Sequence, residues 1–289
     1  MNLGIDIGNY NVKTSEGIIF KSAVSENIEY GNQFDKIEIE GKVYYIGTGR
    51  LEIDYRKFDK ENYIPLLLGS ICKSSNSIEN KIGLGLPIKQ YNSFKDELIN
   101  KLLNKTYDVT FNDIRRRIRI SDIHVFPESV AGIIAHFNST LFDVKYKDIV
   151  SVDIGGKTTD IALIRNKKVI QSSQVNTGTI DIYNCIKNSL EAKYFDIKIN
   201  LDDIKDYLEN GLYYKGERQN ISFAIKNCND LFKEIYNELN LNYPINTSAV
   251  VFQGGGMDLL NSVLSKKISN IIKIDDLFAN AKGYKSLLK

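Results

Sequence analysis

The sequence has 289 residues, of which 43% are hydrophobic and 26% charged, and its formal net charge is +2. That length suffices for two domains of ordinary size, each with a buried core. The nearly balanced charge argues against binding to nucleic acid or membranes through bulk electrostatics, and no apolar run approaches the roughly 18 residues of a membrane-spanning helix. We therefore expect no membrane partner and no direct, sequence-specific binding to DNA.

Cysteine and histidine are scarce. Cys72, Cys185 and Cys228 lack the spacing of a metal or redox motif, and we expect three free thiols in a reducing cytoplasm. The only histidines are His124 and His136, which argues against a histidine-based metal site or nucleophile. The N-terminal residues do not combine a basic segment with a long apolar run, so we expect no signal peptide and a cytoplasmic location.

Hydrophobic periodicity and turn residues predict an alternation of strands and helices. In the first half of the chain we expect strands over 1–22 with a turn at Gly17, a hairpin over 34–48 with a turn at Gly41, a helix that starts at 63–68, a strand over 81–86 and a helix over 90–104. A β-rich segment over 107–126 with a turn at Asn112–Asp113 and a helix over 127–137 follow. In the second half we expect strands over 149–152, 160–164 and 169–175, a mainly helical stretch over 181–242, a strand from 249 and a short helix around 282–284. Within the helical stretch, Gly211 is expected to cap one helix, and Lys215, Glu217 and Arg218 to open the next.

Two short segments repeat one pattern, a strand that ends in Asp-Ile-Gly and turns into a second strand. The first loop is Asp6–Lys13 and the second loop is Asp153–Asp160. Glycines let a backbone approach a phosphate closely, successive N–H groups at such a turn bind anions, and a carboxylate beside them can hold a hydrated Mg²⁺. One Asp-x-Gly turn is most often only a turn, but two copies favour two related half-domains that face one nucleotide.

A third glycine-rich segment strengthens this interpretation. The run 249–253 is an apolar strand, and it ends in Gly254, Gly255 and Gly256 before a helix-like stretch that begins at Met257. A strand, glycine and helix junction places a helix N-terminus against a ligand. The three segments together therefore favour a nucleotide site.

Two other charged features have ordinary explanations as well. Glu128 follows Pro127 at an expected helix start, where a glutamate complements the helix dipole, but it could also orient water at a domain junction. The run of arginines over 115–119 could touch nucleic acid. We favour a solvated strand face for this run, because no aromatic side chains interleave it for stacking on bases.

Together these segments resemble the actin, sugar-kinase and chaperone-ATPase superfamily. Its two phosphate loops, two connecting segments and adenosine motif would correspond here to Asp6–Lys13, Asp153–Asp160, Pro127–Gly132, Ala279–Tyr284 and Phe252–Met257. Within that superfamily, the compact length, the Asn-x-Lys end of the first loop and the Pro-Glu-Ser segment look most like plasmid-segregating bacterial actins of the ParM type. The resemblance implies an α/β, actin-like fold, with two related α/β domains around a nucleotide cleft, each a mixed sheet flanked by helices.

The resemblance also implies domain limits. Domain I would cover 1–147 and a C-terminal helix over 276–289, with a smaller subdomain at about 23–75. Domain II would cover 148–275, with a helical smaller subdomain at about 181–245.

The resemblance further assigns roles to individual residues. Glu128 would activate the attacking water, and Asp6 and Asp153 would act beside it in catalysis and surround Mg²⁺. Residues expected to contact ATP, or GTP, are Gly8, Asn9, Tyr10, Asn11, Lys13, Gly155, Gly156, Lys157, Thr158, Thr159, Gly178, Lys215, Arg218, Gly254, Gly255, Gly256 and Met257. Lys157 stands where a smaller residue is usual, so it either contacts a phosphate or points outward. Lys215 and Arg218 either reach the nucleoside or lie on a solvated face.

The function implied by the resemblance is a filament-forming ATPase. It would polymerise head to tail with Mg-ATP, disassemble after hydrolysis and segregate plasmid DNA through a DNA-binding adaptor protein. A small-molecule kinase of the same fold is an alternative, although no additional carboxylate motif marks the base that a kinase needs. A cell-shape or division actin is another, but neither terminus shows a strong amphipathic membrane helix.

Overall fold

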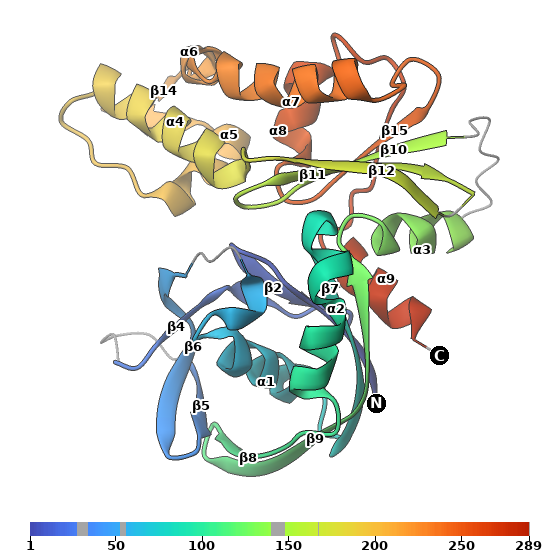
Figure 1. Ribbon diagram of the computed structural model, residues 1–289. Helices are drawn as coiled ribbons and strands as arrows, with labels where there is room; N and C mark the ends of the chain where they lie inside the picture. The colour runs from blue at the N-terminus through green and yellow to red at the C-terminus, as the bar shows by residue number, and fades with distance from the viewer. Residues whose placement is uncertain (28–33, 53–55, 140–147, 167, 289) are drawn as a thin grey trace.

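Two β-sheets organise the chain, and Figure 1 shows them in separate lobes. The computed structural model describes residues 1–27, 34–52, 56–139, 148–166 and 168–288. Each sheet is covered by helices and has its own hydrophobic core. The expected domain boundary at residue 147 lies outside the described residues.

The first lobe is built on a nine-stranded mixed sheet in the order β3-β2-β1-β7-β9-β8-β5-β6-β4. Strand β7 pairs in parallel with β1 and β9 at the centre of the sheet, and the outer pairs are antiparallel. The expected turns at Gly17, Gly41 and Asn112–Asp113 are confirmed, and all four residues have positive φ. The strands are β1 (Asn2–Ile7), β2 (Asn11–Thr14), β3 (Ile19–Lys21), β4 (Ala23–Ser25), β5 (Asp35–Ile39), β6 (Lys42–Leu51), β7 (Glu79–Leu86), β8 (Thr106–Phe111) and β9 (Ile114–Pro127).

The second lobe is built on a five-stranded sheet in the order β12-β11-β10-β15-β16. Strand β10 pairs antiparallel with β11 and parallel with β15, so the second loop and the end of β15 meet at one edge. The strands are β10 (Asp148–Ile154), β11 (Thr159–Arg165), β12 (Lys168–Val175), β15 (Ala249–Gln253) and β16 (Ile271–Lys273), with a separate hairpin of β13 (Leu212–Tyr214) and β14 (Glu217–Gln219).

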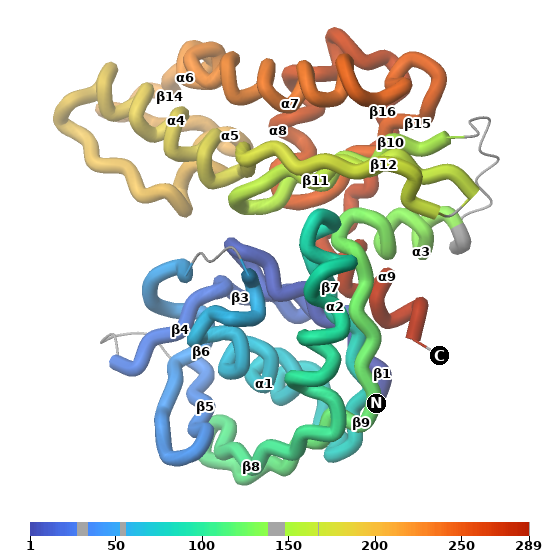
Figure 2. Tube along the Cα trace, viewed as in Figure 1, coloured from blue at the N-terminus to red at the C-terminus, as the bar shows by residue number. Residues whose placement is uncertain are grey.

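The helices cover the sheets and connect the lobes (Figures 1 and 2). Helix α1 packs against β1, β2 and β6 on the inner side of the curved first sheet. Helix α9, at the end of the chain, returns to the first lobe and packs on α3 and β1, where Lys285 Nζ pairs with Glu16 at 2.7 Å. The helices are η1 (Lys57–Asp59), α1 (Tyr63–Ser74), α2 (Ile88–Leu102), α3 (Ala131–Ser139), α4 (Thr179–Lys193), η2 (Leu201–Asp203), α5 (Ile204–Asn210), α6 (Ser222–Asn227), α7 (Asn229–Asn242), α8 (Met257–Leu264) and α9 (Ala279–Leu287), where η marks a 3₁₀ helix.

The expected helix over 127–137 starts later than the sequence predicts. Pro127 is the last residue of β9, where it pairs with Leu86, and the Glu128 N–H donates to the Leu86 carbonyl at 2.8 Å. Ser129 has φ of +66°, outside the helical region, so α3 begins only at Ala131. Glu128 therefore lies on a turn between β9 and α3, not in the first turn of a helix.

The prediction that Lys215, Glu217 and Arg218 open a helix is wrong. They belong to the β13–β14 hairpin, which reverses at Lys215 and Gly216. Both turn residues have positive φ, +51° and +85°, as a tight two-residue hairpin turn requires. The expected helix cap at Gly211 is confirmed.

The prediction of three free thiols is wrong for two of them. Cys185 in α4 and Cys228 between α6 and α7 form a disulfide, with their Cα atoms 5.9 Å apart. The packing of α4 against α6 brings these side chains together in the core of the second lobe. Cys72 is a buried free thiol.

Candidate functional site

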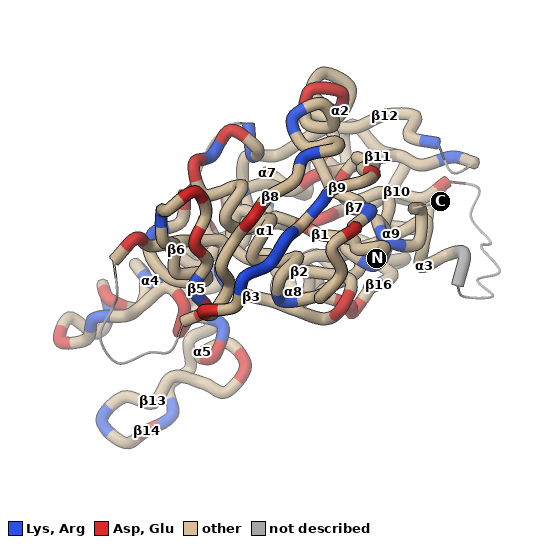
Figure 3. Tube along the Cα trace, turned by 90° about the horizontal axis from the view of Figure 1, so that it is seen from below, with Lys and Arg blue, Asp and Glu red and all other residues tan. Residues whose placement is uncertain are grey.

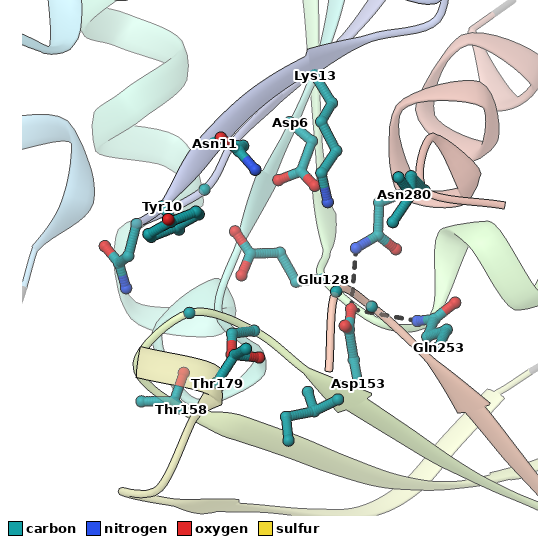
Figure 4. Close-up of a pocket in the computed structure, with 18 of the residues that line it drawn as sticks. Asp6, Tyr10, Asn11, Lys13, Glu128, Asp153, Thr158, Thr179, Gln253 and Asn280 are labelled. Carbon is teal, nitrogen blue, oxygen red and sulfur yellow. Dashed lines mark hydrogen bonds between the residues drawn. The ribbon is translucent and has the colours of Figure 1, made fainter. Parts of the chain in front are cut away.

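The two lobes meet around a cavity of about 230 Å³. Figure 4 shows residues of both loops, Glu128 and the end of β15 around it. The expected site residues that line it are Asp6, Gly8, Asn9, Tyr10, Asn11, Lys13, Glu128, Asp153, Gly155, Gly156, Thr158, Gly254 and Gly255.

The first and second loops have the same local geometry. In the first, the Gly8 N–H donates to the Asn11 carbonyl at 3.1 Å, and in the second the Gly155 N–H donates to the Thr158 carbonyl at 2.9 Å. In both loops the two bonded residues are three positions apart, and the bond closes a tight turn between antiparallel strands. The repeated Asp-Ile-Gly pattern is therefore a structural repeat, with one copy from each lobe on the cavity wall.

Asp6 is the second-last residue of β1 and Asp153 the second-last residue of β10, and both line the cavity. The side-chain amides of Gln253 and Asn280 both donate to Asp153 Oδ2, at 3.2 and 2.9 Å, as Figure 4 shows. These contacts fix the orientation of the Asp153 carboxylate.

The wall around Asp153 also suits a hydrated Mg²⁺. Gln253 Oε1 and Asn280 Oδ1 are buried and have no hydrogen-bond partner among the described residues. Within the same residues, no group of three or more His, Cys, Asp or Glu side chains is close enough to form a metal site alone. A cation here would share its ligands with water and phosphate, as Mg²⁺ usually does.

Gly254 brings the third glycine segment against Asp153. Its φ is +91°, and a Cβ atom there would lie 2.5 Å from Asp153 Oδ1 and 2.5 Å from the Ile154 carbonyl oxygen. No other residue fits this position without moving the carboxylate. The chain then turns into α8, whose first residue is Met257.

Glu128 is held by a lysine that the sequence did not single out. Lys57 Nζ, from η1, donates to both carboxylate oxygens of Glu128 at 2.7 and 2.8 Å. Burial raises the pKa of Glu128 to about 7, and the Lys57 ammonium opposes that rise. Burial lowers the pKa of Lys57, but the carboxylates of Glu128 and Asp6 raise it above its ordinary value.

Two further buried carboxyl groups on the cavity wall have shifted pKa values. Burial raises the pKa of Asp160 to about 6, with the Lys57 ammonium acting in the opposite direction. Burial also raises the pKa of Asp153. Burial therefore disfavours the ionised forms of these carboxyl groups, and a bound cation would stabilise them.

The mouth of the cavity is bridged between the lobes. The Tyr10 hydroxyl donates to Asp202 of η2, and Lys21 Nζ contacts the same carboxylate at 3.3 Å. Tyr10 also packs on the second loop, because a Cβ at Gly156 would lie 2.9 Å from its Cβ. These contacts hold the two lobes together over the cavity.

Several expected contact residues lie behind the loops and do not line the cavity. Lys157 Nζ pairs with Asp181 at 2.9 Å, and Thr159 Oγ1 donates to the Thr177 carbonyl at 2.7 Å. Gly178 caps α4 beneath the second loop. Gly256 packs against Ile154, and the Met257 side chain is in the hydrophobic core of the second lobe.

Lys215 and Arg218 also lie outside the cavity, in the β13–β14 hairpin. Lys215 Nζ contacts Asp196 at 3.6 Å, and 70% of its side chain is exposed. Both residues were expected either to reach the nucleoside or to lie on a solvated face. This placement fits the solvated face.

Sequence reasoning missed part of the cavity wall. The missed polar residues are Lys57, Asp160, Thr179, Tyr183, Asp202, Lys205, Gln253, Asp276 and Asn280. Asp160, Gln253 and Asn280 fall inside the segments chosen by resemblance, so their position beside a loop or glycine run was an available signal. Lys57 comes from a charged stretch with no motif, and only the folded chain brings it to Glu128.

Family models match both halves of the sequence. Residues 4–130 match the N-terminal domain of actin-like proteins, and residues 151–266 match the C-terminal domain of archaeal, MreB-like actin homologues. No curated protein matches the sequence significantly. In the part of the chain that the structure describes, no helix is long and apolar enough to cross a membrane.

Solved structures share the fold over the whole chain. An archaeal actin homologue is 20% identical, with 98% of both chains covered and a TM-score of 0.84. Its complex with ADP is also 20% identical, with coverage of 98% of this chain and 97% of that one and a TM-score of 0.84. A 15-stranded ParM filament from Clostridium botulinum is 23% identical, with 99% of both chains covered and a TM-score of 0.79. The fold is therefore actin-like, and the chain belongs to the actin-like proteins, with ParM filaments and archaeal actin homologues among its structural relatives.

Proposed function

We propose that this chain is a cytoplasmic ATPase that assembles head to tail with Mg-ATP, or Mg-GTP, and disassembles after hydrolysis. The observation that carries the proposal is the convergence of Glu128, Asp6 and Asp153 on one cavity between the two loops. Two relatives support it, since the C. botulinum ParM was solved as a filament and the archaeal homologue as an ADP complex.

The residues present define how such a site would work. Backbone N–H groups of the two loops would bind the phosphates. Asp6 and Asp153 would hold Mg²⁺, which would supply positive charge against the phosphates. Glu128 would accept a hydrogen bond from the attacking water and aim it at the terminal phosphate. Positioning of this kind carries much of the rate in phosphoryl transfer.

We also propose the expected division into domain I (1–147 with 276–289) and domain II (148–275). The smaller subdomains would cover about 23–75 and about 181–245. The assignment of strands β1 to β9 to one sheet and of α9 to the same lobe supports these limits.

For the biological role, we propose plasmid segregation through a DNA-binding adaptor protein. Figure 3 shows the arginine run of β9 as a basic stripe. Three of its four arginines have partners in the fold: Arg117 pairs with Asp108 at 2.7 and 3.0 Å, Arg119 pairs with Glu79 at 3.1 Å, and Arg116 donates to the Ser75 carbonyl. The carboxylates paired with Arg117 and Arg119 reduce the positive charge available for phosphate contacts, which supports DNA capture by a separate adaptor.

The test is light scattering and phosphate release, recorded in parallel after Mg-ATP is added to the wild type and to Glu128→Gln. We expect both proteins to assemble, but phosphate release from Glu128→Gln should be on the order of 10²-fold slower or more. Its polymers should therefore persist longer. Glu79→Gln, a change at the first residue of β7, where 55% of the Glu79 side chain is exposed, should behave like the wild type.

No assembly and no phosphate release by the wild type would contradict the proposal. If ATP is consumed only when a sugar or other alcohol is added as phosphate acceptor, the protein is a kinase of the same fold. Wild-type phosphate release by Glu128→Gln would remove that residue from the mechanism.

A further inference from the structure

The contact between Lys57 and Glu128 is a buried ion pair on the cavity wall. Its two partners are 71 residues apart in sequence and come from different elements, η1 and the turn after β9. The side chain of Lys57 is 11% exposed and that of Glu128 is 10% exposed. Because Lys57 Nζ lies within 2.8 Å of both oxygens, it fixes the carboxylate in a single orientation.

The segment that carries Lys57 is itself firmly anchored. Phe58 is completely buried in the core of the first lobe, and the Phe58 carbonyl accepts a hydrogen bond from Lys101 Nζ at 2.6 Å. Two residues later, Lys60 Nζ donates to Asn9 Oδ1 of the first loop at 2.8 Å. Lys57 is thus placed by packing and hydrogen bonds, unlike a solvated surface lysine.

The charges that face Glu128 make this lysine necessary. The titratable groups that interact with Glu128 are Lys57 of η1, Asp6 of β1, Asp160 of β11, Tyr63 of α1 and Tyr284 of α9. Among these groups, only Lys57 is positively charged. Without it, a buried carboxylate beside two others would take up a proton. A protonated Glu128 has lost the negative charge with which a carboxylate attracts and orients a water.

We propose that Lys57 is a positioning residue that fixes the Glu128 carboxylate at the cavity wall and favours its ionised form, in which it can orient the attacking water. This inference rests on the proposed role of Glu128 in hydrolysis. It assigns a function to η1, a segment that neither loop nor any glycine motif includes.

The first test compares the steady-state kinetics of Lys57→Met, Lys57→Arg and the wild type with Mg-ATP. We expect Lys57→Met to lower kcat by about 10–100-fold at neutral pH, with a much smaller change in KM. The acid limb of its pH–rate profile should move up by about one pH unit or more. Lys57→Arg should restore most of the rate, because it keeps the positive charge.

Lys73→Met is the matched control. Lys73 also forms a partly buried ion pair in the first lobe, with Asp35, but it does not line the cavity. Its loss should leave the pH profile unchanged. An unchanged pH profile in Lys57→Met would overturn the inference, whether or not the overall rate falls, because a purely structural lysine would not shift the profile.

The second test needs no hydrolysis. Infrared spectra recorded against pH follow the carboxylic acid C=O band of Glu128, identified by its absence in Glu128→Gln. In Lys57→Met this band should persist to a higher pH than in the wild type, by about one unit or more. If the shift appears but the wild type hydrolyses no nucleotide, the proposed ATPase fails while the control of Glu128 ionisation by Lys57 stands. Hydrolysis without the shift would overturn the role of Lys57 and leave the ATPase intact.

Discussion

Asp153 lies directly opposite Asp160 across the β10–β11 hairpin. At the equivalent place in the first hairpin, Asp6 lies opposite Lys13. The repeat therefore pairs a carboxylate with an ammonium in one lobe and with a second carboxylate in the other. Among the described residues, side-chain amides from both lobes donate hydrogen bonds to this pair of carboxylates: Gln174 to Asp160, and Gln253 and Asn280 to Asp153.

This arrangement predicts a pH-dependent cost of folding at Asp160. Burial raises its pKa from 3.8 to about 6, so the folded protein binds this proton more tightly than the unfolded chain. The stabilising contribution of the protonated group is complete below pH 3.8 and is lost as the pH rises through about 6. Asp160→Asn should therefore gain stability over the wild type as the pH rises, by up to roughly 3 kcal/mol at neutral pH.

The measurement is urea unfolding between pH 4 and 8, without nucleotide or Mg²⁺. Asp258→Asn provides the control, because the Asp258 side chain is 75% exposed, and its stability curve should run parallel to that of the wild type. Parallel curves for Asp160→Asn and the wild type would contradict the prediction.

A second prediction concerns the metal. Asp153→Ala should weaken Mg-ATP binding by about 10²-fold, a loss of roughly 3 kcal/mol, because it removes a carboxylate that Gln253 and Asn280 hold toward the cavity. Calorimetric titration of each protein with ATP, in Mg²⁺ and again with EDTA, isolates the contribution of the metal to the binding affinity. EDTA should reduce the wild-type affinity toward that of the variant and should hardly affect the variant itself. Equal Mg²⁺ dependence in both folded proteins would show that Asp153 does not hold the ion.

A third prediction concerns nucleotide release. Asp202 accepts hydrogen bonds from Tyr10 and Lys21 of the other lobe. Asp202→Asn weakens both contacts, and since the Asp202 side chain is 57% exposed, we expect only a modest effect, about 3–10-fold faster release of a fluorescent ATP analogue. Asp203, in the same 3₁₀ helix, accepts a hydrogen bond from Asn200 of its own lobe, and Asp203→Asn should release the analogue at the wild-type rate. Identical release from the two variants would mean that the bridge does not retain nucleotide.

A fourth prediction concerns the disulfide. Cys185 and Cys228 close a loop with a sequence separation of 43, and opening it should cost about 2–4 kcal/mol. Dithiothreitol should therefore lower the melting temperature of the wild type and of Cys72→Ser, but not that of Cys185→Ser. If dithiothreitol leaves the wild-type curve in place, the two thiols are not oxidised in solution, as a reducing cytoplasm would dictate.

Local patterns in the sequence predicted most of the fold. The two Asp-Ile-Gly hairpins and the strand before Gly254 were predicted correctly, because alternation, β-branching and glycine turns are local properties. Pro127 misled the prediction of a helix start, since its pairing with Leu86 in the parallel sheet extends the strand through it. Lys215 and Gly216 formed a hairpin turn that charge patterning alone does not distinguish from a helix start.

The site was predictable where it coincides with those local motifs. Glu128 and the two loops were found because each is a short contiguous signal. Lys57 was not found, because the property that marks it is its contact with Glu128, which is 71 residues away in the sequence. The disulfide was missed for the same reason, since the spacing of Cys185 and Cys228 matches no motif and only the packing of α4 on α6 makes them neighbours.

The contact of Tyr10 with Gly156 has a consequence for how the lobes move. A methyl group at position 156 would lie 2.9 Å from Tyr10 Cβ, which is too close for both groups to stay in place. Gly156→Ala would thus act as a wedge, propping the lobes apart without changing a single charge in the cavity. The absence of a side chain at this position sets how tightly the two halves can shut.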